Sequence, residues 1–181
     1  MIEIDGITVE FGRIRPLDDL SARFAAPING PNGAGKTTLL NVISGFITPV
    51  AGEVRLSGTP LIGLPPVKRM RLGLRRTFQQ ELVVEDLTAF DNVLAIADHA
   101  CANAAAAKAE VARAVEFAGL SDVLKVPGRR LNLFQRRMVE LAKTLIGGSK
   151  VILLDEPEAG LNDQETGALR ARLQAIPAEF G

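Results

Sequence analysis

The sequence has no tryptophan, no tyrosine, one cysteine and one histidine among its 181 residues. A single cysteine excludes a disulfide framework within the chain and fits a reducing compartment. No window approaches the roughly 18 apolar residues of a membrane-spanning helix, and the opening stretch "MIEIDGITVEFG" lacks the basic and apolar regions of a signal peptide. The net charge is zero, so no overall attraction to nucleic acid is expected and none is predicted as a partner.

What is present favours one α/β domain with a subdomain. Residues 2–10 alternate apolar and polar side chains, as a strand does, and Asp5-Gly6 predicts a turn or bulge inside it. Residues 20–24 are predicted to form a short strand, and residues 51–58 an alternating strand. Residues 80–130 are predicted to be an Ala-rich helical insertion that Thr88 and Asp91 cap. Residues 150–157 are predicted to form a strand buried on both faces.

Two other stretches carry weaker signals. The basic run "VKRMRLGLRR", residues 67–76, is interpreted as a solvated helix face. The closing stretch "LRARLQAIPAEFG" is predicted to be a helix and a turn that leads toward a further strand. An α/β chain that alternates helix and strand in this way favours a parallel core sheet.

The stretch "GPNGAGKTTLLNVISG" begins with G-x-x-x-x-G-K-[ST], from Gly30 to Thr37. Its glycines let successive backbone N–H groups point at phosphate oxygens, and the helix that follows adds its positive N-terminal end. Lys36 can reach the β- and γ-phosphates, and the Thr37 hydroxyl can bind Mg²⁺. Gly45 is a natural residue to end that helix.

A matching acidic element lies downstream in "KVILLDEP". Asp155 can hold Mg²⁺, and Glu156 is placed to polarise an attacking water as a general base. Alone, this could be a strand that ends in a polar turn. Together with the phosphate loop it predicts a nucleotide-hydrolysing site.

These motifs, together with "RRTFQQ" and "LLDEPEAGLN", make the chain resemble an ATP-binding cassette (ABC) protein, the ATP-binding subunit of an ABC transporter. The resemblance runs from about residue 2 to the last residue, and it is strongest to the cassettes of branched-chain amino acid importers. It implies an α/β P-loop NTPase fold of the ABC type, with an N-terminal antiparallel β subdomain and an inserted helical subdomain. The implied divisions are residues 1–79, 80–138 and 139–181.

The resemblance also implies roles for individual residues. Phe11 matches the aromatic position that stacks on adenine, although a core strand position is the alternative. Gln79 matches the glutamine that senses Mg²⁺ and the attacking water, and Asn162 lies in the loop that crosses to the other subunit. The implied nucleotide contacts are Phe11, Asn32, Gly33, Ala34, Gly35, Lys36, Thr37 and Thr38, and the implied metal ligands are Thr37, Gln79 and Asp155.

Where the family has "LSGGQ", which contacts ATP on the opposite subunit, this sequence reads "LNLFQ" from Leu131 to Gln135. Asn132 is a good N-cap and Gln135 falls at N3, so a helix is predicted to begin here. Leu133 and Phe134 carry bulk where glycines admit a phosphate. The stretch is therefore either a variant cross-subunit element, with Asn132 and Gln135 as contacts, or only a helix start.

The family pattern continues with another strand and a histidine that contacts the γ-phosphate, so the chain is expected to be short at its C-terminus, with the last core strands missing. The leading hypothesis is an ATPase subunit that binds ATP and Mg²⁺, pairs with a second cassette and powers an integral membrane permease. It would lie in the cytoplasm on the inner face of the membrane, and import branched-chain amino acids or a similar solute. The alternative is a catalytically weak nucleotide-binding module of a heteromeric transporter.

Overall fold

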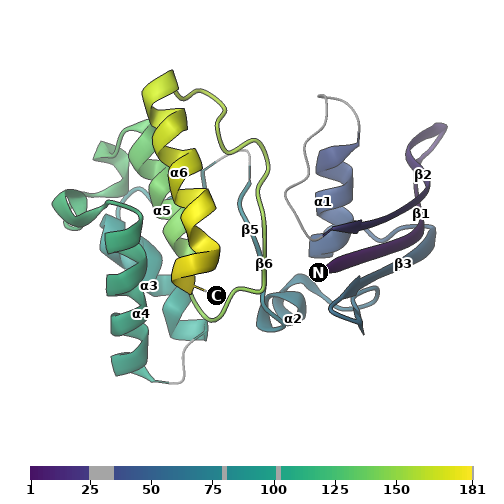
Figure 1. Cartoon of the computed structure of the whole chain (residues 1–181), viewed down its shortest axis with the longest axis horizontal. Helices are drawn as coiled ribbons and strands as arrows, with labels where there is room; N and C mark the ends of the chain where they lie inside the picture. Colours follow the sequence, from purple (N-terminus) through teal and green to yellow (C-terminus); the bar gives the residue numbers. More distant parts are fainter. Residues whose placement is uncertain (25–34, 79–80, 101–102, 181) are drawn as a thin grey trace. The chain divides into compact units, whose positions relative to one another are not determined.

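A computed structural model of the chain describes residues 1–24, 35–78, 81–100 and 103–180 (Figure 1). The chain divides into two compact units, Met1–Arg75 and Arg76–Gly181. The first contains β1 (Ile2–Phe11), β2 (Ile14–Phe24), α1 (Lys36–Ser44), β3 (Ala51–Leu56), β4 (Thr59–Pro60), α2 (Pro66–Arg71) and most of β5 (Leu74–Arg76). The second contains α3 (Ala89–Ala100), α4 (Ala104–Phe117), short 3₁₀ turns at Ser121–Val123 and Gly128–Arg130, α5 (Leu133–Thr144), β6 (Val151–Leu153) and α6 (Asp163–Phe180).

The first unit is built on a four-stranded antiparallel sheet of order β2-β1-β3-β4, with α1 beside it (Figure 1). Ile2 and Ile4 of β1 are buried, and after a register shift Ile7 and Val9 take over the buried positions. The shift lies at Asp5-Gly6, so the predicted irregularity in this strand is confirmed. It keeps the apolar side chains of both halves in the core.

Two predictions for the first unit are wrong in extent. Strand β2 begins at Ile14, not near residue 20, because Phe11 and Ile14 pair to close a hairpin with β1. Pro16 is tolerated since β2 is an edge strand of the sheet. The basic run is not a wholly solvated helix face either. Arg69 and Arg75 are buried, with 4% and 7% of their surface exposed.

The second unit has a helical core in which α3, α4 and α5 pack together. Its buried side chains include many alanines, which allow close approach of the helices: Ala89, Val93 and Ala97 of α3, Ala107, Val111 and Ala114 of α4, and Met138, Val139, Leu141 and Ala142 of α5. The predicted cap at Thr88 and Asp91 forms, with the Asp91 N–H donating to Thr88 Oγ1 at 3.1 Å. The helical insertion is thus confirmed, while the three residue divisions stay a prediction.

The C-terminal part departs from expectation at two points. Strand β6 spans three residues rather than eight, and its partner β5 is equally short. Val151 and Ile152 are only half-buried, so the predicted burial on both faces is wrong for them. Helix α6 continues through Pro177 to Phe180, where a turn was predicted. In this last turn the Phe180 ring packs edge-on against Phe117, with centroids 5.1 Å apart.

Candidate functional site

The described part of the phosphate loop begins at Gly35, which only glycine can occupy. Its φ is +79°, and a Cβ there would lie 2.7 Å from the Pro16 carbonyl oxygen of β2. Helix α1 starts directly after it, with the Leu39 N–H donating to the Gly35 carbonyl at 2.8 Å. Lys36, Thr37 and Thr38 therefore occupy the first turn of α1, where backbone N–H groups have no acceptor within the helix. The predicted contacts at Asn32, Gly33 and Ala34 lie outside the described residues, as does Gly30.

The other end of α1 is held by a buried arginine that the sequence did not single out. Arg69 of α2 donates to the Val42 carbonyl at 2.6 Å, to Ile43 at 2.8 Å and to Leu64 at 2.8 Å. Burial lowers the pKa of Arg69. The last carbonyls of a helix carry partial negative charge, so they provide a suitable environment for this cation. Gly45 ends the helix in the left-handed conformation, as predicted.

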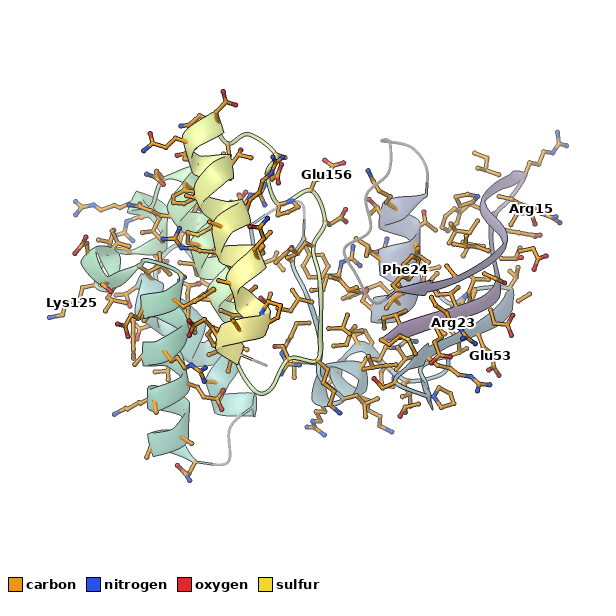
Figure 2. All side chains as sticks on the ribbon, in the orientation of Figure 1. Arg15, Arg23, Phe24, Glu53, Lys125 and Glu156 are labelled. Carbon is orange, nitrogen blue, oxygen red and sulfur yellow. The ribbon has the colours of Figure 1, made fainter. Side chains whose placement is uncertain are left out.

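The predicted acids lie in the second unit, after β6. Asp155 is buried, with 4% of its surface exposed, and its Oδ2 lies 3.1 Å from Nη2 of Arg76. Glu156 is exposed and projects from the loop after β6 (Figure 2). Its φ is +49°, a left-handed conformation that costs a non-glycine residue about 1 kcal/mol. Strain of this kind concentrates at functional positions.

The segment that follows Glu156 is fastened within its own unit. Glu158 accepts two hydrogen bonds from Arg170, both of 2.7 Å. Asn162 caps α6, because its Oδ1 accepts from the Glu165 N–H at 2.9 Å while the Glu165 carboxylate accepts from the Asn162 N–H at 3.1 Å. The side-chain oxygen of this predicted cross-subunit residue is therefore engaged within the chain.

Helix α5 begins with a complete capping box, as predicted. Asn132 Oδ1 accepts from the Gln135 N–H at 2.8 Å, and Gln135 Oε1 accepts from the Asn132 N–H at 3.0 Å. Leu133 is 38% exposed, while Phe134 packs against the helical core. Leu133 also lies against the loop after the acids, since a Cβ on Gly160 would come within 2.9 Å of Leu133 Cδ2.

Two other predicted residues are placed differently. Phe11 is 52% exposed at the end of β1, so the alternative of a core position is excluded. Gln79 lies outside the described residues, but the chain leading to it is fixed by the Thr77 N–H, which donates to the Leu153 carbonyl at 2.9 Å.

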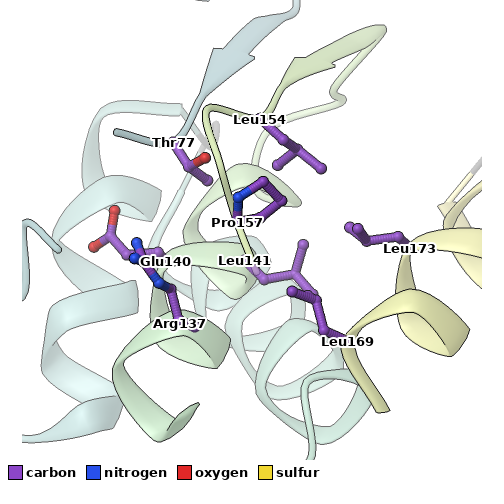
Figure 3. Close-up of a pocket in the computed structure, with 8 residues that line it drawn as sticks. All are labelled: Thr77, Arg137, Glu140, Leu141, Leu154, Pro157, Leu169 and Leu173. Atoms are coloured by element: carbon purple, nitrogen blue, oxygen red, sulfur yellow. The ribbon is translucent and has the colours of Figure 1, made fainter. Parts of the chain in front are cut away.

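A small cavity in the second unit lies between the segments that follow β5 and β6 and the helices α5 and α6 (Figure 3). Its volume is about 10 Å³, and it is lined by Thr77, Arg137, Glu140, Leu141, Leu154, Pro157, Leu169 and Leu173. Thr77 Oγ1 is buried and makes no hydrogen bond among the described residues. This space suits one water molecule and is far too small for a nucleotide.

The donor set fits Mg²⁺ in its chemistry. A threonine hydroxyl and an aspartate carboxylate are the hard oxygen ligands that Mg²⁺ prefers. Among the described residues no cluster of three or more His, Cys, Asp or Glu side chains could hold a metal by itself. Mg²⁺ is usually held by one or two carboxylates together with water molecules and the phosphate oxygens of a substrate.

Helix α1 with Gly35 and Lys36 at its start, the buried Asp155 and the inserted helices are the features of an ATP-binding cassette. The profile described as "ABC transporter" matches residues 20–159, and the chain belongs to this family. It is 31% identical to the high-affinity branched-chain amino acid transport ATP-binding protein BraF of Pseudomonas aeruginosa, over 99% of this chain and 78% of that protein. It is 34% identical to the arabinose import ATP-binding protein AraG 2 of Burkholderia thailandensis, over 98% of this chain but only 35% of that protein.

The fold agrees with solved cassettes. A structure of MJ1267, an ATP-binding cassette of an ABC transporter, superimposes with a TM-score of 0.86 at 25% identity, over 98% of this chain and 77% of that one. The predicted ABC-type fold and the assignment to the ABC ATPases are thus confirmed. No helix in the described part of the chain is both long and apolar enough to cross a membrane.

Proposed function

We propose that this chain is the ATP-binding and ATP-hydrolysing subunit of an importer for branched-chain amino acids or a similar small solute. The observation that carries the proposal is the family match over residues 20–159, which includes Gly35-Lys36-Thr37 and Asp155-Glu156. The likeness to BraF extends over most of both chains, which favours amino acids over arabinose as the solute.

In this proposal the first unit supplies the phosphate contacts. The N–H groups of Asn32, Gly33, Ala34, Gly35, Thr37 and Thr38 surround the phosphates, and the Lys36 ammonium group binds the β- and γ-phosphates. Phe11, being exposed, is available to stack on the adenine ring. Each of these groups binds and orients ATP without taking part in bond making.

The second unit supplies the acids. The residues that would hold Mg²⁺ are Asp155, Gln79 and Thr37, and the ion neutralises phosphate charge when bound. Glu156 accepts the proton of the attacking water as that water forms a bond to the γ-phosphorus and ADP leaves. The exposed position of Glu156 supports this role, because a general base must reach a water molecule.

The partners belong to the proposal as well. A second cassette would meet Asn132, Gln135 and Asn162, and an integral membrane permease would hold the pair at the inner face of the membrane. The exposed helix start of α5 supports the first contact, since its N-terminal N–H groups favour an anion such as a phosphate.

Replacing Lys36 by alanine tests the function. The unaltered chain is expected to bind Mg·ATP in calorimetry, and Lys36→Ala is expected to lose about two orders of magnitude or more in affinity, because it loses a charge-assisted contact with phosphate. Lys68→Ala is the matched control, since Lys68 is exposed on α2 and should leave binding unchanged. A folded wild-type chain that binds no nucleotide would refute the proposal.

A second candidate function, a cassette that contributes poorly to its partner's site, is favoured by Leu133. This side chain is 38% exposed at the start of α5, where bulk hinders the approach of a phosphate. Phe134, in contrast, packs into the helical core and is not a suitable target for change.

Leu133→Gly is therefore expected to raise the ATPase rate of the paired cassettes on the order of tenfold, by reopening access to the helix N-terminus. Leu133→Ala is the control that removes most of the bulk while keeping helix propensity, and it should give a smaller increase. Phosphate release by the paired cassettes provides the measurement. An unchanged rate in both variants would count against the weak-site interpretation.

A further inference from the structure

The carboxylate proposed to hold Mg²⁺ already has a cationic partner in this chain. Asp155 Oδ2 and Arg76 Nη2 lie 3.1 Å apart, and the two side chains are 4% and 6% exposed. The Arg76 guanidinium carbon also lies 4.8 Å from the centre of the Phe78 ring. A buried ion pair is screened little by solvent, so each charge strongly affects what else its partner can bind.

The pair is fixed by the backbone. Arg76 is the last residue of β5, Asp155 comes two residues after the end of β6, and these strands form a two-stranded sheet. The Thr77 N–H donates to the Leu153 carbonyl at 2.9 Å, next to the ion pair. The pairing of the two strands therefore places the Arg76 guanidinium group next to the Asp155 carboxylate.

We propose that Arg76 weakens Mg²⁺ binding at Asp155 and so sets the Mg²⁺ concentration at which nucleotide binds tightly. This inference rests on the proposed function. A fixed positive charge beside the carboxylate offsets part of its attraction for a divalent cation. In the metal-free chain the same contact holds the buried carboxylate in place beside Arg76.

Two other roles for Arg76 make different predictions. If Arg76 only stabilises the fold, its replacement should lower the melting temperature and leave the Mg²⁺ requirement unchanged. If it instead orients Asp155 for the metal, its replacement should raise the Mg²⁺ requirement. The sign of the change therefore separates the three roles.

The experiment is a Mg²⁺ titration of ATP affinity in the full chain, measured by calorimetry. Arg76→Gln keeps a hydrogen-bond donor for Asp155 but removes the charge, and it is expected to lower the Mg²⁺ midpoint roughly tenfold. Arg76→Lys keeps the charge and should leave the midpoint near that of the wild type. An unchanged or higher midpoint in folded Arg76→Gln would overturn the proposal.

A second measurement uses the unaltered protein, in case Arg76→Gln does not fold. The Arg76 Nε–Hε NMR signal, assigned by its loss in Arg76→Lys, is expected to shift when Mg²⁺ is added to the ATP-bound chain. Addition of Ca²⁺-free, Mg²⁺-free ATP alone should leave it in place. If Mg²⁺ raised the affinity for ATP without shifting the Arg76 signal, the proposed competition would be contradicted.

Failure of the proposed function would look different. In that case the wild type and Arg76→Gln would both bind no nucleotide, and Lys36→Ala would change nothing. Direct Mn²⁺ binding, followed by electron paramagnetic resonance without nucleotide, still tests Arg76. Arg76→Gln should bind Mn²⁺ at a lower concentration than the wild type, Asp155→Asn should abolish this gain, and equal binding by all three would refute the inference.

Discussion

Glu156→Gln is expected to lower the rate of ATP hydrolysis by about two to four orders of magnitude while ATP binding remains. Glutamine has the shape of glutamate but cannot accept the proton of the attacking water. Glu156 is exposed after β6 and is well placed to reach that water, whereas Asp155 is buried beside Arg76. Phosphate release under single-turnover conditions measures the loss, and retention of ATP by the purified variant shows that binding survives.

Glu158→Gln is the matched control, because it makes the same substitution two residues away. Glu158 pairs with Arg170 through two hydrogen bonds of 2.7 Å and has no predicted role in chemistry. An exposed pair of this kind contributes little to stability, because solvent screens its charges. Its hydrolysis rate should stay close to that of the wild type, and comparable losses in both variants would argue against Glu156 as the base.

Arg69→Met is expected to lower the free energy of unfolding by about 2–4 kcal/mol. The guanidinium group donates to the carbonyls of Val42 and Ile43 at the end of α1, and methionine would leave both without this donor. The variant also removes the positive charge from the negative end of the helix. Urea unfolding, followed by circular dichroism, measures the change.

Two neighbouring substitutions control for it. Lys68→Met removes an equal charge from an exposed position of the same helix and should cost less than about 0.5 kcal/mol. Arg69→Lys keeps the charge and part of the hydrogen bonding, so it should recover part of the stability. If Arg69→Met and Lys68→Met were equally stable, the capping role of Arg69 would be wrong.

Features set by neighbours in the sequence could be predicted well. The capping box of Asn132 and Gln135 depends on residues three positions apart, and it forms as expected. The bulge at Asp5-Gly6 and the helix end at Gly45 likewise follow from local backbone preferences. The fold class was also predicted correctly, because the motifs resemble those of a known family.

Contacts between distant residues were not predictable from local patterns. An arginine in a basic run is usually solvated. Only the folded chain shows that Arg69 donates a hydrogen bond to the end of α1 and that Arg76 forms an ion pair with Asp155. In the same way, the turn predicted near Pro177 does not form: helix α6 continues to Phe180, which packs on the distant Phe117. The contact between Leu133 and Gly160 could not be predicted from the sequence either.

The left-handed backbone of Glu156 has a consequence for evolution. A glycine at this position would relieve conformational strain of about 1 kcal/mol, so selection for stability alone would tend to remove the glutamate. The proposed role of Glu156 in hydrolysis would account for a glutamate at this position despite the strain. A descendant of this chain that had given up hydrolysis and kept only its place in a complex would be free to drift at position 156. In such a lineage, glycine or asparagine there would mark the loss of the chemistry before any motif had visibly decayed.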